Sequence, residues 1–130
     1  MKQRIRPPTI VIVDDDPDCT SILSFLFTQE MEFSTRIYRT GLDILKDLQL
    51  VMDLQPVLFF IDQCLPRIEG LSLCEVLRTQ AEMRKTPLIL ITADRARPLQ
   101  SRAERLDVFI LGKPFDLDEI VQLVRDTVPC

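Results

Sequence analysis

Residues 9–16 read TIVIVDDD, a β-branched apolar run that ends abruptly in three consecutive aspartates. An apolar run without polar alternation is typical of a parallel strand buried on both faces. Residues 57–61 (VLFFI), 88–92 (LILIT) and 108–111 (VFIL) share this character. Residues 33–38 (FSTRIY) alternate instead, which favours an edge strand. The sequence therefore predicts five strands.

Amphipathic segments separate these runs and predict a helix after each strand. The positions expected to face the core are Ile22, Leu23, Leu26 and Phe27, then Leu42, Leu45 and Leu48, then Leu73, Cys74 and Leu77, and finally Leu117, Ile120, Val121 and Val124. Asp116 and Glu119 are spaced as a capping box at the start of the last helix. The segment 94–106 has the weakest helical pattern, because Pro98 must lie in its first turn or break it.

Strands that alternate with helices five times predict an α/β fold with a parallel sheet covered by helices on both faces. Five such units in 130 residues suit a doubly wound, flavodoxin-like (βα)5 sheet of order 2-1-3-4-5. This length favours one domain over residues 1–130. Residues 1–8, which carry a short basic start, are expected to be a flexible N-terminal extension.

Composition excludes several classes of function. The chain has no histidine, which excludes Ser-His triads, His-metal sites and an internal phosphohistidine. It has no apolar run of the ~18 residues that a membrane span needs and no signal-peptide core, so we expect a cytoplasmic protein without membrane contact. A net charge of −4 argues against direct nucleic-acid binding. Cys19, Cys64, Cys74 and Cys130 form no C-x-x-C pair, which favours free thiols, with Cys19 and Cys74 in the core.

Polar residues follow the apolar runs at the point where each predicted strand ends. They are Asp14, Asp15 and Asp16 after the first run, Asp62 after the third, Thr92 after the fourth and Lys113 after the fifth. The carboxyl ends of parallel strands meet at one edge, where doubly wound sheets bind ligands. Two carboxylates ~4 Å apart repel by about 1 kcal/mol in water and about 4 kcal/mol at an effective dielectric near 20. This edge therefore needs compensating cations.

Lys113 supplies one positive charge at this edge, and a hard divalent ion such as Mg²⁺ would supply the rest. Carboxylates, a hydroxyl and a lysine together are suited to phosphoryl transfer, with one carboxylate as the nucleophile. Asp16 is expected to be an exposed turn residue and not a ligand.

Four stretches resemble the signatures of the receiver domain of two-component response regulators, of the chemotaxis-regulator type. They are VIVDDDPD (11–18), FFIDQCLPRIEG (59–70), ILITA (89–93) and GKPF (112–115). Each stands at the end of a predicted strand, and the resemblance runs from about Ile10 to the C-terminus. It implies that Asp62 is the phosphoacceptor and that Thr92 and Lys113 bind phosphoryl oxygens.

The resemblance also implies a metal site and a set of partners. The metal is Mg²⁺, with Mn²⁺ as an alternative, and its implied ligands are Asp14 (mostly through water), Asp15, Asp62 and the backbone carbonyl of Cys64. Pro66 and Gly70 would shape the loop after Asp62, and the bond from Lys113 to Pro114 would be cis. The implied phosphoryl donor is a sensor histidine kinase or a histidine phosphotransfer protein. A downstream protein would bind the face formed by the 94–106 helix, the last strand and the last helix, with a homodimer left open.

Two departures from the family concern this output face. The family's switch aromatic lies three residues before the lysine, and here that position is Ile110. Phe109 precedes it, and neighbouring strand residues point to opposite faces, so Phe109 is not expected to replace the aromatic. The turn at 103–107 lacks the family's glycine. We therefore expect phosphorylation without an aromatic relay.

Two other functions remain open at this point. Asp14, within the DDD run, fits the nucleophile motif of a haloacid-dehalogenase-like phosphatase, with Thr92 and Lys113 as its later motifs. That alternative lacks the acidic pair expected after the lysine and leaves Asp62 unexplained. The other alternative is an interaction module on a receiver fold that never carries phosphate. The favoured interpretation is a signalling phosphoacceptor that catalyses only its own phosphorylation and dephosphorylation.

Overall fold

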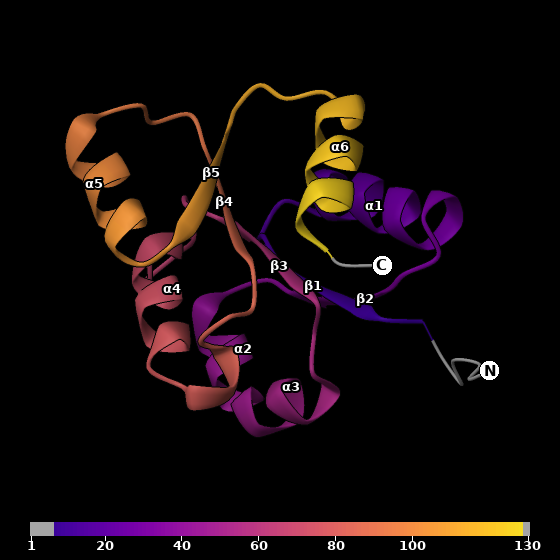
Figure 1. The fold of residues 1–130 in the computed structure, drawn as a ribbon, viewed down its shortest axis with the longest axis horizontal. Helices are drawn as coiled ribbons and strands as arrows, with labels where there is room; N and C mark the ends of the chain where they lie inside the picture. The colour runs from indigo at the N-terminus through magenta and orange to yellow at the C-terminus, as the bar shows by residue number, and fades with distance from the viewer. Residues whose placement is uncertain (1–6, 129–130) are drawn as a thin grey trace.

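In the computed structural model, which describes residues 7–128, five parallel strands form one sheet in the order β2-β1-β3-β4-β5 (Figure 1). The strands are β1 (Thr9–Val13), β2 (Ser34–Tyr38), β3 (Leu58–Asp62), β4 (Leu88–Thr92) and β5 (Val108–Gly112). The helices are α1 (Pro17–Phe25), α2 (Gly41–Lys46), α3 (Leu48–Leu54), α4 (Gly70–Arg78), α5 (Arg97–Arg105) and α6 (Leu117–Thr127), with a π-helical turn η1 (Leu26–Glu30) and a 3₁₀ turn η2 (Ala81–Met83). The predicted strand order and the edge position of β2 are confirmed.

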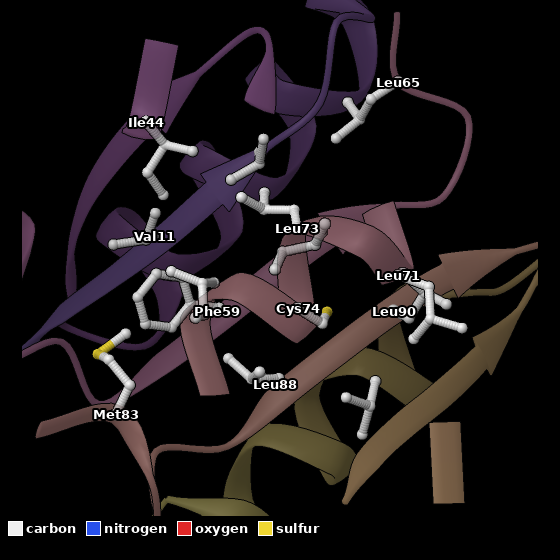
Figure 2. Close-up of a cluster of buried hydrophobic side chains, with 14 of the residues drawn as sticks. Val11, Ile44, Phe59, Leu65, Leu71, Leu73, Cys74, Met83, Leu88 and Leu90 are labelled. Carbon is white, nitrogen blue, oxygen red and sulfur yellow. The ribbon is translucent and has the colours of Figure 1, made fainter. Parts of the chain in front are cut away.

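The sheet has a hydrophobic core on each face. Ile10 and Ile12 pack with residues of α1 and α6, whereas Val11 and Val13 pack with residues of α2 to α5. Figure 2 shows the second cluster, in which Val11, Phe59 and Leu90 meet side chains of α2 and α4. Every residue of β3 and β4 is buried. Burial on both faces explains the unbroken apolar runs, because each large side chain so buried contributes about 1.5–3 kcal/mol.

Predictions at helix starts are confirmed. Asp116 accepts a hydrogen bond from the Glu119 amide at 2.8 Å, and the Glu119 carboxylate accepts from the Asp116 amide at 3.0 Å, which completes the capping box. Pro98 lies in the first turn of α5, where a missing amide proton costs nothing. These local rules depend on few neighbours, which is why the sequence predicts them well.

Predictions of the buried helix positions are partly wrong. Ile22, Leu42 and Leu117 are 53%, 37% and 44% exposed. In the second helical segment Leu45 and Leu48 are partly buried against the core as predicted, but the fully buried side chains are Ile44 and Val51. The chain forms two helices there instead of one. The break falls at Asp47, whose carboxylate accepts a 2.8 Å hydrogen bond from the Tyr38 hydroxyl. Apolar spacing cannot reveal that long-range bond.

Parts of the sequence predictions fall on residues outside the described range. These are residues 1–6 of the expected extension, and Cys130. The carbonyl of Pro8 accepts a 2.9 Å hydrogen bond from the Ser34 amide at the start of β2. Cys19, Cys64 and Cys74 are free thiols, as expected. Among residues 7–128, no helix has the length and apolar character needed to span a membrane.

Candidate functional site

The carboxyl ends of β1, β3 and β5 line a cleft of about 480 Å³. Its walls include Asp14, Asp62 and Lys113, which lie far apart in the sequence. Carboxylate oxygens of Asp14, Asp15 and Asp62 lie within 4.8 Å of one another. Asp14 and Asp62 are 2% and 4% exposed, so most of their charge is withdrawn from water. The structure therefore brings together three of the four acidic residues that the sequence places at strand ends.

Asp14 is the least satisfied group in this cleft. Its Oδ1 atom accepts a 3.0 Å hydrogen bond from the Asp16 amide, but its buried Oδ2 atom has no partner among the described residues. Burial raises the pKa of Asp14, although the hydrogen bond from Asp16 partly opposes this effect. An unpartnered buried carboxylate oxygen is costly, and a cation in the cleft would satisfy it.

Asp16 does not take part in the cluster. Its side chain accepts a 3.0 Å hydrogen bond from the Asp18 amide and caps α1, with the side chain exposed to solvent. The expectation of a solvent-exposed turn residue is confirmed. Its amide still serves the site, because it donates to Asp14.

Lys113 is paired directly with Asp62. The Lys113 Nζ atom lies 2.8 Å from Asp62 Oδ1. Burial alone would lower the pKa of Lys113, but the hydrogen bond and charge of Asp62 outweigh it, so the pKa is raised. The Lys113–Pro114 peptide bond is cis, as expected. One ammonium group thus faces three carboxylates, and Asp62 is the one that it contacts.

Thr92 ends β4 beside the cleft and is 3% exposed. It pairs with Gly112 in the sheet, and its carbonyl accepts a 2.8 Å hydrogen bond from the Lys113 amide. Its Oγ1 atom accepts a 3.0 Å hydrogen bond from the Asp94 amide. The backbone thereby fixes the hydroxyl and the lysine relative to each other.

Close packing holds the loop after Asp62. A Cβ atom at Gly70 would collide with the Asp62 carbonyl and would lie 2.9 Å from Gln63 Cα. The Gln63 side chain then accepts a 2.8 Å hydrogen bond from the Leu71 amide, which fastens the start of α4 to the end of β3. Gly70 thus sets the position of α4 through contact and not through an unusual φ.

The rest of this loop turns back on itself near Cys64 and Pro66. The Pro66 carbonyl accepts a 2.7 Å hydrogen bond from the Ile68 amide, with Arg67 at a φ of 68° between them. Cys64 is exposed, and no described residue donates a backbone hydrogen bond to its carbonyl. That oxygen is therefore free to act as a ligand.

The sequence patterns missed Cys19 as a wall of the cleft. It lies in the first turn of α1, partly buried, and lines the cleft beside Asp14 as well as packing against the core. Burial is the main cause that raises the pKa of Cys19 to about 12, which keeps the thiol protonated at neutral pH. Helical spacing marked Cys19 only as apolar. Its place one turn after the DDD run was the available signal.

The geometry of β5 agrees with the expectation that Phe109 and Ile110 point to opposite faces of the sheet. Phe109 is 55% exposed, whereas Ile110 packs against the core cluster on the α5 side. The two side chains point to opposite faces, so Phe109 does not occupy the position of the family's aromatic.

Three clustered carboxylates, a hydroxyl and a paired lysine, at the carboxyl edge of a doubly wound sheet, define an α/β protein built for phosphoryl chemistry. A comparison with protein families identifies which one. The chain matches the response regulator receiver domain over residues 10–125 and belongs to that family. The comparisons give no support to the phosphatase alternative.

Individual relatives agree with this assignment. The chain is 30% identical over 123 residues to the DNA-binding dual master transcriptional regulator RpaA of Synechocystis, with 91% of this chain and 48% of that protein covered. The chemotaxis protein CheY4 of Vibrio cholerae shares the fold, with a TM-score of 0.82 at 16% identity and coverage of 94% and 99%. So does the receiver domain of the sensor histidine kinase PA1611 of Pseudomonas aeruginosa, solved with a magnesium ion in its active site cleft (TM-score 0.78, 18% identity, coverage 93% and 97%). The chain spans about half the length of the curated relatives it matches.

Receiver domains bind Mg²⁺ at an acidic site, and this cleft fits such an ion. Mg²⁺ favours oxygen ligands, usually one or two carboxylates together with water and phosphate. The unpartnered Oδ2 atom of Asp14 and the nearby oxygens of Asp15 and Asp62 supply that donor set.

Proposed function

We propose that Asp62 accepts a phosphoryl group from a phosphohistidine on a sensor histidine kinase or a histidine phosphotransfer protein. The observation that carries the proposal is the 2.8 Å contact between Lys113 Nζ and Asp62 Oδ1, in a cleft with two further carboxylates within 4.8 Å. An Asp62 carboxylate oxygen attacks phosphorus, the phosphorus–nitrogen bond breaks, and the donor imidazole leaves with the electron pair. Residues 1–130 contain no histidine, so the phosphohistidine lies outside this sequence.

The neighbouring residues have distinct parts in this transfer. The Lys113 ammonium pairs with a phosphoryl oxygen once Asp62 carries the phosphoryl group, and the Thr92 hydroxyl donates a hydrogen bond to another. Mg²⁺, or Mn²⁺ in its place, would be held by Asp14, Asp15, Asp62 and the Cys64 carbonyl and would neutralise charge on the phosphoryl oxygens. The chain in this account catalyses only the gain and the loss of its own phosphoryl group.

The phosphorylated domain then acts through another protein. We assign the partner surface to the face formed by α5, β5 and α6, with a homodimer as the alternative occupant. RpaA is named a DNA-binding regulator, but the net charge of −4 on this chain argues against direct nucleic-acid contact by residues 1–130. The proposal treats residues 1–130 as one receiver domain acting in the cytoplasm.

The test is a phosphorylation assay read by intact mass. With acetyl phosphate and Mg²⁺ the wild-type chain should gain the mass of one phosphoryl group, and EDTA should prevent the gain. Asp62→Asn should gain none, because an amide is not a nucleophile for this transfer. Asp126→Asn is the matched control, since Asp126 is an exposed aspartate outside the acidic cluster, and it should gain the group normally. A phosphorylated Asp62→Asn protein, or an unmodified wild type, contradicts the proposal.

A further inference from the structure

Gly112, the last residue of β5, lies beneath an arginine side chain. A Cβ atom at Gly112 would lie 2.8 Å from Arg95 Nη2 and 3.3 Å from Arg95 Cζ, so the guanidinium rests where a side chain would otherwise stand. No glycine in residues 7–128 has a positive φ, which means that backbone conformation does not require glycine here. Arg95 is therefore the group that a side chain at position 112 would displace.

Arg95 belongs to the loop between β4 and α5, and Thr92 organises that loop. The Asp94 amide donates to Thr92 Oγ1 at 3.0 Å, and the Ala96 amide donates to Asp94 Oδ1 at 2.8 Å. Arg95 itself forms no ion pair with any residue from 7 to 128. Its position thus depends on the loop and on the space over Gly112.

The contact lies in a groove between α5 and β5. The groove, about 350 Å³, is lined by Arg95, Ile110 and Gly112 together with residues of α5. Ile110 and Gly112 are two residues apart on β5 and so face the same side of the sheet. Ile110 packs against the core beneath, which leaves the outer part of the groove to the arginine.

We propose that Arg95 couples the phosphorylation cleft to this groove, acting as a positioning residue through Thr92. The inference rests on the proposed function. When the Thr92 hydroxyl turns to a phosphoryl oxygen on Asp62, the Asp94 amide loses its acceptor, the 93–96 loop rearranges, and the guanidinium leaves Gly112. Contact between Arg95 and Gly112 therefore stabilises the unphosphorylated arrangement and opposes occupancy of the cleft.

The test measures the affinity of the full chain for beryllofluoride, a phosphoryl mimic, by calorimetry with saturating Mg²⁺. Arg95→Ala removes the guanidinium, and Gly112→Ala displaces it, because the atom in the way is the far end of a flexible side chain. Each variant should bind beryllofluoride about fivefold more tightly, at the low end of usual coupling effects. The double variant should gain no more than either single one, since both remove the same contact.

Arg97→Ala is the matched control, because it removes an exposed arginine two residues along the chain and should leave the affinity unchanged.

A second measurement follows the Arg95 Nε resonance by NMR. Beryllofluoride should shift it in the wild type and in Thr92→Ser, which keeps the hydroxyl, but not in Thr92→Val. Three results would overturn this inference alone. They are wild-type affinity in Arg95→Ala and Gly112→Ala, a double variant whose gain in affinity is the sum of the two single gains, and a beryllofluoride-induced shift in Thr92→Val as large as in the wild type. A wild type that binds no beryllofluoride overturns the proposed function as well.

Discussion

The charged side chains at the two ends of the sheet differ in how fully their charges and hydrogen bonds are satisfied. At the carboxyl end, three carboxylates share the ammonium of Lys113, and a buried oxygen of Asp14 has no partner in the described chain. At the amino end of β4 and β5, the single guanidinium of Arg78 donates to a set of backbone carbonyls and faces no carboxylate within hydrogen-bond distance. Four of these carbonyls, each 2.7–2.8 Å away, belong to Met83, Thr86, Leu106 and Asp107, and a fifth, of Arg84, lies 3.3 Å away.

This difference means that Arg78 serves the stability of the fold, whereas the acidic cleft serves ligand binding. Arg78 ties the turn before β4 to the turn before β5, and every bond it makes exists in the resting protein. The acidic cleft is incomplete by itself, because Lys113 alone does not balance its carboxylates and a bound cation is needed to compensate the remaining charge. We therefore expect substitutions at the amino end to destabilise the fold, and substitutions in the cleft to stabilise it while they abolish ligand binding.

The largest expected effect is at Arg78. Arg78→Met keeps the aliphatic stem but leaves the carbonyls of both turns without a donor, and it should lower the free energy of unfolding by about 3 kcal/mol. Urea denaturation measures this change. Arg84→Met is the matched control, since Arg84 is exposed and only its backbone carbonyl, which the substitution keeps, accepts a 3.3 Å hydrogen bond from Arg78; it should stay within about 0.5 kcal/mol of the wild type. Equal effects of the two substitutions would contradict the role of Arg78.

Asp14→Asn should change stability in the opposite direction. In EDTA at neutral pH it removes a buried charge and should raise the unfolding midpoint by about 3 °C, while Mg²⁺ should no longer add protection. Thermal unfolding with and without Mg²⁺ measures both effects. A variant less stable than the wild type in EDTA would show that the Asp14 charge is not a cost to the fold.

The stabilities of the wild type and of Asp14→Asn can also be compared as a function of pH. The pKa of Asp14 is raised in the folded chain, chiefly by burial, so protonation of Asp14 favours folding. The stability that this protonation adds is fully present below the ordinary pKa of 3.8 and is lost as pH rises through the raised pKa of the folded state. The stability advantage of Asp14→Asn in EDTA should therefore shrink as pH falls toward 3.8. An advantage independent of pH would mean that charge is not its cause.

Asp15→Ala should have a smaller stabilising effect, because Asp15 is exposed and water screens its repulsion from Asp14 and Asp62. Its unfolding midpoint in EDTA should lie between those of the wild type and Asp14→Asn, and Mg²⁺ should no longer raise it. Asp18→Ala is the control, as another exposed aspartate that lies outside the cluster. A midpoint below that of the wild type would refute the account of crowded anions.

Strand positions were predictable because each strand is buried on both faces. The predicted runs differ from the observed strands by at most one residue at either end, as at β3, which ends with Asp62 itself. The meeting of Asp14, Asp62 and Lys113 followed from strand order alone, since every strand of this parallel sheet ends at the same edge.

Features that depend on long-range contacts were not predictable. The hydrogen bonds of Arg78 reach residues 28 and 29 positions along the chain, and no local pattern encodes them. The guanidinium of Arg95 over Gly112 also joins two separate segments, the loop before α5 and the end of β5. The prediction that Ile22 is buried is wrong for another reason. Amphipathic spacing marks one wide apolar face of the helix, but the sheet covers only part of that face.

The smallest expected effect on stability is at Ile110. Ile110→Tyr restores an aromatic residue at the family's switch position, where the groove beside it has room for the ring. The free energy of unfolding should change by less than about 1 kcal/mol, and the rate of phosphorylation by acetyl phosphate should be unchanged. The Arg95 resonance should differ, because the ring enters the space that the guanidinium occupies. An unchanged resonance would place Arg95 outside this groove in solution.

The most direct measurement maps the position of the acyl phosphate. The chain is phosphorylated with acetyl phosphate and Mg²⁺, reduced with borohydride so that the aspartyl phosphate becomes homoserine, and digested for peptide sequencing by mass spectrometry. The account predicts homoserine at position 62 and aspartate at positions 14 and 15. Homoserine at position 14, or none in a protein that has gained a phosphoryl group, would contradict it.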